Sequence, residues 1–190
     1  MIIYVDTSLL LSPFRIGDEN YKFMGIINSK KHIQIVTGTL AIVEITSVLL
    51  REVHLFNTAL KVISEDDSLG EISLLSLQLQ VRLAIKYILQ YYRVKVLEDY
   101  KPEESNILVE GCLISPIFKL LINSTIKSKL RTIDLLHYYT ASYYSNIKEL
   151  KIDYLITSYY TFQKMRDVFG EESSLTIISP ETFIEKERVT

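Results

Sequence analysis

The stretch that decides the fold is Ile2-Ile3-Tyr4-Val5-Asp6-Thr7-Ser8. Its first four residues form a continuous apolar run, which is typical of a short strand buried on both faces of a parallel sheet. Asp6 follows this run without a spacer. A carboxylate that abuts a wholly apolar strand needs a hydrogen-bonding cap or a ligand. Asp6 is therefore the first candidate functional residue.

The rest of the chain alternates short β-branched runs with longer helical patterns. Further strands are predicted at 32–36, 93–97, 154–157 and 175–178. Helices are predicted at 20–29, 39–52, 69–90 as one helix or as two with a break, 107–123 with an interruption near Pro116, 132–144 with Thr132 as its N-cap, and 161–168; the segment 179–182 then closes the domain. This alternation indicates an α/β fold with three α/β/α layers around a central parallel sheet.

The helix predicted at 39–52 is amphipathic. Leu40, Val43, Ser47 and Leu50 share the stripe that such a helix packs against its core, and Glu44 lies beside that stripe. Glu44 would then be placed at the border of the buried face.

One domain accounts for the whole chain. Its 190 residues suit a single core, and the sequence has no internal repeat, low-complexity tract or Gly/Ser linker. We therefore expect a single domain over residues 1–190, with an enlarged helical middle segment at about 53–128.

The amino-acid composition indicates which partners and which cellular location to expect. The formal net charge of -2 provides no global basic field, so any nucleic-acid contact must come from a local patch. Cys112 is the single cysteine and cannot form an intramolecular disulfide, which favours a reducing, cytoplasmic location. The chain has neither a signal peptide pattern nor an apolar segment of membrane-spanning length, so we expect no membrane partner.

Polar residues far apart in the sequence converge if this topology is right. In open parallel sheets, sites form beyond the carboxyl ends of the strands. Asp6 and Thr157 each end a predicted strand, Glu44 lies early in the helix after the second strand, and Asp134 lies in the first turn of a later helix. We therefore expect all of them at one edge of the sheet.

Converging carboxylates repel one another, and a hard divalent cation would resolve the repulsion. Mg²⁺ and Mn²⁺ prefer oxygen ligands and keep several waters, so Asp6, Glu44 and Asp134 would suffice to hold one ion. Simpler interpretations stay open at this point. The helix dipole alone favours Asp134 in a first turn, and Glu44 alone could be a solvated helix residue.

Other side chains near the predicted site have two interpretations each. Lys127, Lys129 and Arg131 could neutralise phosphates or could belong to a solvated loop. His137, one helical turn after Asp134, could bond to it, but a packing or surface role is expected. The six tyrosines of the later chain could stack on bases or pack in a core or interface: Tyr138, Tyr139, Tyr143, Tyr144, Tyr159 and Tyr160.

Five stretches, in this order, resemble the PIN-domain family of ribonucleases: Ile3-Tyr4-Val5-Asp6-Thr7-Ser8, Thr39-Leu40-Ala41-Ile42-Val43-Glu44, Leu130-Arg131-Thr132-Ile133-Asp134-Leu135-Leu136-His137, Tyr154-Leu155-Ile156-Thr157 and Ser179-Pro180-Glu181-Thr182-Phe183. The resemblance implies an endoribonuclease that depends on Mg²⁺ or Mn²⁺ held by Asp6, Glu44 and Asp134. Ser8 and Thr157 would order a metal-bound water or a ligand. It also implies RNA as the substrate, a homodimer, and a small antitoxin protein if the chain is the toxin of such a pair.

The chain departs from the family pattern at one position. The family often places a further Asp two residues after the Thr, and here Tyr159 stands there. Asp153 precedes its strand and would lie at the opposite edge, and Asp167 lies late in the next predicted helix. The departure favours an alternative, a catalytically weakened RNA- or protein-binding module on the same fold.

Overall fold

The computed structural model describes residues 1–15, 17–64, 72–98, 107–109, 111–114, 116–128, 130–146, 150–159 and 175–189. Its centre is a five-stranded, all-parallel sheet with the strand order β3-β2-β1-β6-β7. The strands are β1 (Ile2–Val5), β2 (Gln34–Gly38), β3 (Val94–Leu97), β6 (Tyr154–Ile156) and β7 (Thr176–Ile178). The predicted parallel sheet is confirmed, and each of its strands lies within two residues of a predicted one.

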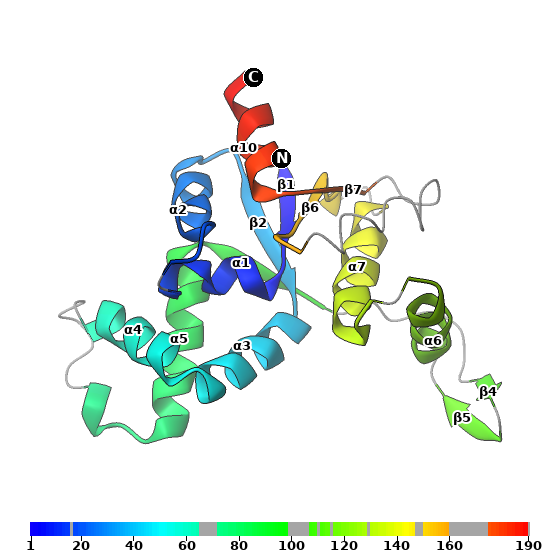
Figure 1. Cartoon of the computed structure of the whole chain (residues 1–190), viewed down its shortest axis with the longest axis horizontal. Coiled ribbons are helices and arrows are strands. Elements are labelled where there is room, and N and C mark those ends of the chain that lie inside the picture. Colours follow the sequence, from blue (N-terminus) through cyan, green and yellow to red (C-terminus); the bar gives the residue numbers. More distant parts are fainter. Residues whose placement is uncertain are drawn as a thin grey trace.

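The sheet separates two hydrophobic cores, which gives the molecule three layers (Figure 1). Side chains alternate between the faces of a strand. Ile3 and Val5 therefore belong to one core, and Tyr4, between them in the sequence, belongs to the other. Ile3, Tyr4 and Val5 are all fully buried, as expected for a strand in the middle of a covered sheet.

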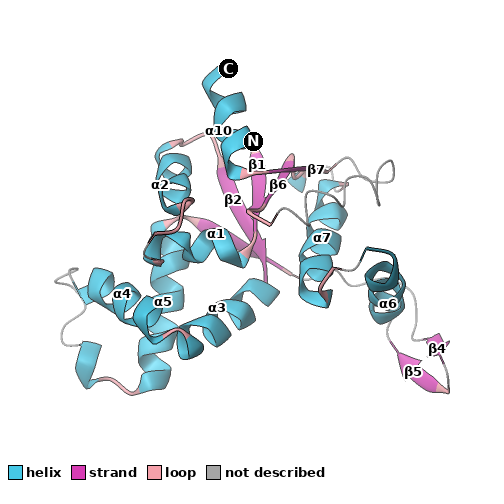
Figure 2. Cartoon of the chain, viewed as in Figure 1, coloured by secondary structure: helices cyan, strands magenta, loops and turns pink. Residues whose placement is uncertain are grey.

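The helices are divided unequally between the two faces (Figure 2). The face with Ile3 is covered by α1 (Thr7–Leu11), α2 (Tyr21–Ser29), α3 (Leu40–Arg51), α4 (Val53–Ser64), α5 (Leu77–Tyr91) and α10 (Pro180–Val189), together with the short helices η1 (Ser12–Phe14) and η3 (Ile72–Leu74). The face with Tyr4 is covered by α6 (Pro116–Ser128) and α7 (Thr132–Ser145). None of the described helices is long and apolar enough to cross a lipid bilayer.

The middle segment is less helical than its sequence suggests. It contains α4, α5 and α6, but also β3 and an antiparallel hairpin of β4 (Ile107–Val109) and β5 (Cys112–Ile114). The helix predicted at 107–123 is therefore wrong over its first half, because Gly111 adopts a φ of 79° and turns the chain back on itself. Figure 1 shows this hairpin beyond α6, away from the central sheet.

Three smaller predictions are corrected. The predicted stripe of α3 is wrong: Val43 and Leu50 are exposed, and Ala41, Ile45 and Leu49 are buried instead. Thr132 is the first residue of α7, whose N-cap is Arg131. The segment 179–182, which was expected to close the domain, instead leads into a helix, α10, that continues to Val189. The helix predicted at 161–168 lies outside the described residues.

Candidate functional site

Asp6 connects the central strand to the first helix. It follows β1 directly and caps α1, with its Oδ1 accepting a hydrogen bond from the backbone N of Leu9 at 3.1 Å. Oδ1 also accepts from Ser8 Oγ at 2.6 Å, and Oδ2 accepts from Thr157 Oγ1 at 2.5 Å. Asp6 is therefore held from both its own helix and the end of β6, and the hydroxyls of Ser8 and Thr157 both point to its carboxylate.

Glu44 reaches the same region from the second turn of α3. Its Oε2 accepts hydrogen bonds from Thr7 Oγ1 at 2.5 Å and from His137 Nε2 at 2.7 Å. Burial pushes the pKa of Glu44 upward, but the two hydrogen bonds and the charges of His137 and Arg131 outweigh burial and leave the pKa below its ordinary value. The residue is thus a fixed, ionised carboxylate, and not the solvated helix residue of the simpler interpretation.

His137 is the functional residue that sequence reasoning missed. It is 3% exposed and bridges Glu44 to Tyr4, whose hydroxyl oxygen lies 2.7 Å from its Nδ1. The only signal in the sequence was its position one helical turn after Asp134, which places both on one face of α7. Its partner proved to be Glu44 on another helix.

The carboxylate end of this chain of hydrogen bonds determines its direction, and the Gly38 end is compatible with it. The backbone N–H of Gly38 can only donate, and it donates to the Tyr4 hydroxyl oxygen at 2.9 Å. At the other end, the ionised Glu44 can only accept. Neutral His137 therefore carries its hydrogen on Nε2 and accepts from the Tyr4 hydroxyl at Nδ1.

Asp134 has an internal cationic partner. The guanidinium of Arg131 donates to both carboxylate oxygens, from Nη2 to Oδ1 at 2.8 Å and from Nε to Oδ2 at 3.0 Å. The same guanidinium lies over the ring of Tyr159, with 4.8 Å between its Cζ and the ring centroid. The hydrogen bond with Asp134 raises the pKa of Arg131 above its ordinary range, so the guanidinium stays charged.

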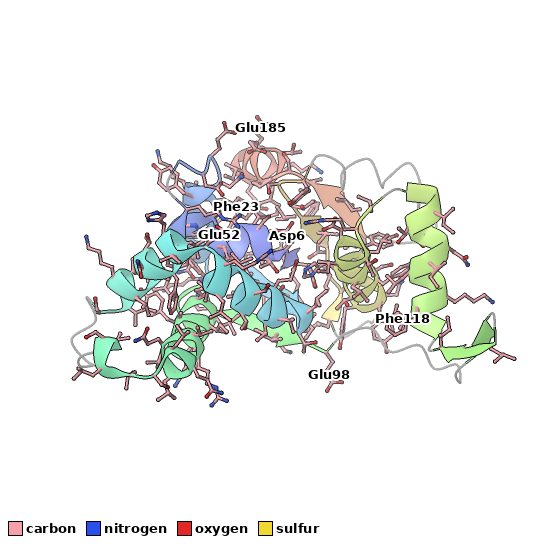
Figure 3. The ribbon with its side chains drawn as sticks, turned by 60° about the horizontal axis from the view of Figure 1, so that its bottom comes forward. Asp6, Phe23, Glu52, Glu98, Phe118 and Glu185 are labelled. Carbon is pink, nitrogen blue, oxygen red and sulfur yellow. The ribbon has the colours of Figure 1, made fainter. Side chains whose placement is uncertain are left out.

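These groups line one cleft of about 220 Å³ beyond the carboxyl ends of the strands. Asp6, Glu44 and Asp134 all contribute to its wall, as do His137 and Tyr159. Figure 3 shows the labelled Asp6 between α3 and α7, the helices that carry the other two carboxylates. The structure thus brings together the three acidic residues that the sequence selected.

The donor chemistry of the cleft fits a hard divalent cation, because all three acidic residues offer carboxylate oxygens. The side-chain positions do not yet form a binding set. Among the described residues, no group of three or more His, Cys, Asp or Glu is arranged to hold a metal ion. Arg131 takes both oxygens of Asp134, but its side chain is 60% exposed and has open solvent to turn into.

The position where the family pattern has a further Asp lies at the cleft. Tyr159 occupies this position and lines the cleft, with the guanidinium of Arg131 over its ring. Asp153 lies at the opposite edge of the sheet, where its Oδ2 accepts from the backbone N of Ile2 at 2.9 Å. Asp167 lies outside the described residues. At this position of the cleft the chain therefore has an aromatic ring beneath an arginine, where the family pattern has its further Asp.

The remaining predicted residues are divided between core and surface. Arg131 lies in the cleft, whereas Lys129 and Tyr160 are outside the described residues. Tyr138 is 5% exposed and packs in the core on the α7 face, and Tyr143 is 40% exposed. Among the described tyrosines considered as stacking platforms, Tyr159 is the one that the cleft includes.

Comparison of the sequence with models of known protein families gives no match, and comparison with curated protein sequences gives none. The resemblance to PIN domains therefore stays a prediction from five short stretches. What can be said of function rests on the cleft itself.

Proposed function

We propose that the chain is a metal-dependent endoribonuclease that hydrolyses phosphodiester bonds of RNA, with Asp6, Glu44 and Asp134 as the residues that hold Mg²⁺ or Mn²⁺. The observation that carries the proposal is the convergence of three carboxylates, from the end of β1, from α3 and from α7, on one cleft at the carboxyl edge of a parallel sheet.

The residues around the carboxylates have defined tasks in this proposal. His137 and Thr7 keep Glu44 ionised and oriented, and Thr157 fixes Asp6. When Arg131 leaves Asp134, its guanidinium can pair with a phosphate oxygen in the same cleft. A divalent cation, when bound, would supply activation of the attacking water and neutralisation of the phosphate charge. Hydrolysis joins the water oxygen to phosphorus and breaks one P–O ester bond, and the proton that the water loses is matched by one taken up by the departing oxygen.

The test is cleavage of a single-stranded RNA by wild type, Asp134→Asn and Asp18→Asn prepared identically. Wild type and Asp18→Asn should cleave in Mg²⁺ or Mn²⁺ and stop in EDTA, because Asp18 lies outside the cleft. Asp134→Asn should not cleave RNA, because it lacks one metal ligand. Its circular dichroism spectrum should match that of wild type, which shows that the fold is intact. Equal degradation by all three proteins would identify a contaminating ribonuclease and end the proposal.

A second candidate, a binding module with weakened catalysis, is favoured by the contact of Arg131 with Asp134 and Tyr159. An internal cation at Asp134 competes with an external one. If the cleft is a metal site, Arg131→Gln should bind Mn²⁺ several-fold more tightly than wild type in calorimetry, and Arg82→Gln, at an exposed position outside the cleft, should not. Absence of Mn²⁺ binding by all three proteins would favour the binding module.

We also propose two protein partners, which the resemblance implies. A second copy of the chain and a small inhibitory antitoxin are the partners to test, by light scattering of the pure protein and by co-expression with the product of a neighbouring short reading frame.

A further inference from the structure

The cleft does not end at its carboxylates. Arg15, Arg51 and Glu52 line the cleft and also line a second hollow of about 800 Å³. The other residues of this second hollow come from the end of η1 and the start of α4: Phe14, Val53, His54, Leu55 and Thr58. Because three lining residues are shared, the two hollows adjoin, and together they are called the groove.

The backbone of α3 gives the length of this groove. Glu44, Val48 and Arg51 line it in succession along the helix. Arg51 is seven positions after Glu44 in the helix, which corresponds to about 10 Å along the axis. Figure 3 shows the labelled Glu52 at the far end of α3 from Asp6. A ligand at the carboxylates would have to be extended to reach the second hollow.

The charges change along the groove. Glu52 is paired with Arg15, with 3.1 Å between Oε1 and Nη2. Arg51 donates from Nε to the backbone O of Ser47 at 3.2 Å. Within the part of the chain that the structure describes, no carboxylate forms a salt bridge with Arg51. Its outer nitrogens thus offer a charged donor pair at the junction of the two hollows.

The wall beyond Arg51 is mainly apolar. Val53 is 62% exposed, His54 is also exposed, and Phe14 lies at the inner wall. A guanidinium beside an exposed apolar and aromatic surface is the combination that binds single-stranded nucleic acid, because the guanidinium takes a backbone phosphate and the apolar surface takes a base. The local basic patch that the acidic net charge requires for RNA binding would lie here.

We propose that the second hollow is a subsite for the part of a single-stranded RNA that flanks the cleaved bond, with Arg51 at a backbone phosphate and Val53 and His54 beside a base. The identity of the ligand rests on the proposed function. With this subsite, the protein would bind a polynucleotide more tightly than a small phosphodiester, because only the polynucleotide is long enough to reach the second hollow.

The experiment measures binding of a short fluorescein-labelled single-stranded RNA by fluorescence anisotropy, in EDTA and at several salt concentrations. Arg51→Gln should bind several-fold more weakly than wild type. The slope of the logarithm of the binding constant against the logarithm of salt concentration should fall by about 0.7, the value for one phosphate contact on a single strand. The matched control is Arg82→Gln, an exposed arginine on α5 outside the groove, which should bind as wild type does.

A second pair of variants keeps the test decisive if Arg51→Gln does not fold. Val53→Glu should weaken RNA binding and Val53→Lys should strengthen it, since the side chain is exposed and both variants add a long charged group. Equal binding by Arg51→Gln and wild type, or by the two Val53 variants, would overturn the subsite.

Failure of the subsite can be distinguished from failure of the proposed function. Hydrolysis of bis(p-nitrophenyl) phosphate by wild type in Mn²⁺ tests the carboxylate end alone, because this small ester is too short to reach from Glu44 to the second hollow. Hydrolysis without an effect of Arg51 on RNA binding removes the subsite only. RNA binding that depends on Arg51, without any hydrolysis, supports the subsite and removes the nuclease.

Discussion

Glu44 Oε2 is the atom on which the contacts of the cleft converge. It accepts from Thr7 and from His137, and through His137 it is connected to Tyr4 and to the backbone of Gly38. Each donor comes from a different element, so the position of one carboxylate depends on the packing of β1, β2, α1 and α7. Such a carboxylate is positioned before any ligand arrives.

The direction of this hydrogen-bond chain leads to a prediction about His137. Neutral His137 should be the Nε2–H tautomer, because the Tyr4 hydroxyl donates to Nδ1. Nitrogen-15 NMR of the imidazole, in EDTA and at a pH where the ring is neutral, distinguishes the two nitrogens directly. In Tyr4→Phe the Nε2–H tautomer should persist, because the ionised Glu44 still accepts a hydrogen bond from Nε2. A pure Nδ1–H tautomer in wild type would contradict the assigned direction.

Glu44 should also make stability depend on pH. Its folded pKa is lowered from the ordinary 4.5, so the unfolded chain binds the proton more tightly than the folded chain does. The resulting stabilisation is fully present above the ordinary pKa and is lost as pH falls through the folded pKa. Urea unfolding of metal-free protein should therefore show a shallower acid-side loss in Glu44→Gln than in wild type.

The control for this pH series is Glu19→Gln, at an exposed position outside the cleft. Glu19→Gln should follow the wild-type curve. If Glu44→Gln follows it too, the hydrogen bonds to Glu44 do not discriminate between its charged and neutral forms.

At the scale of elements, α3 carries the correction with the clearest consequence. Ile45 is fully buried in the core on the α3 face, whereas Val43 is 64% exposed. Ile45→Ala should lower the free energy of unfolding by about 2–5 kcal/mol, the usual cost of emptying a core position. Val43→Ala should change it by less than about 0.5 kcal/mol, as surface substitutions do. Chemical denaturation of both variants checks this assignment. A larger loss of stability in Val43→Ala than in Ile45→Ala would support the predicted stripe instead.

The α3 stripe illustrates what the sequence could and could not provide. The strands of the sheet were predictable because short apolar runs such as Ile2 to Val5 have one stable environment, the interior of a parallel sheet. On α3, nearly every residue from Leu40 to Val43 is apolar, so periodicity does not select one face. The buried face of α3 is selected by its packing against α1, α4 and α5, and the local sequence of α3 does not contain that information.

The candidate site shows the same limit. Asp6, Glu44 and Asp134 were found because each stands at a strand end or near a helix start, where topology brings residues together. His137 was missed because its role depends on Glu44, 93 positions away. The hairpin at 107–114 was missed because its apolar residues suit a helix as well as a strand, and Gly111 is the one local sign of a turn.

For the molecule as a whole, the cleft joins elements from both faces of the sheet. Asp6 follows the central strand directly, Glu44 belongs to α3 on one face, and Asp134 belongs to α7 on the other. A cation bound by all three would therefore oppose global unfolding. Mn²⁺ at 100 times its dissociation constant should stabilise the fold by about 2.7 kcal/mol and raise Tm.

Thermal unfolding of wild type and Asp6→Asn with and without Mn²⁺ measures this effect. Asp18→Asn is the matched control because Asp18 lies outside the cleft. Tm should rise in wild type and in Asp18→Asn and should not rise in Asp6→Asn. A similar rise in all three proteins would mean that Mn²⁺ binds elsewhere.

The acidic side chains of the cleft already have partners within the chain: Arg131 at Asp134, Arg15 at Glu52, and His137 with Thr7 at Glu44. The polypeptide therefore needs no cation to bring α3 and α7 together at the strand ends. Under the proposed function, the chain can therefore fold first and bind its cation in a later, separate step.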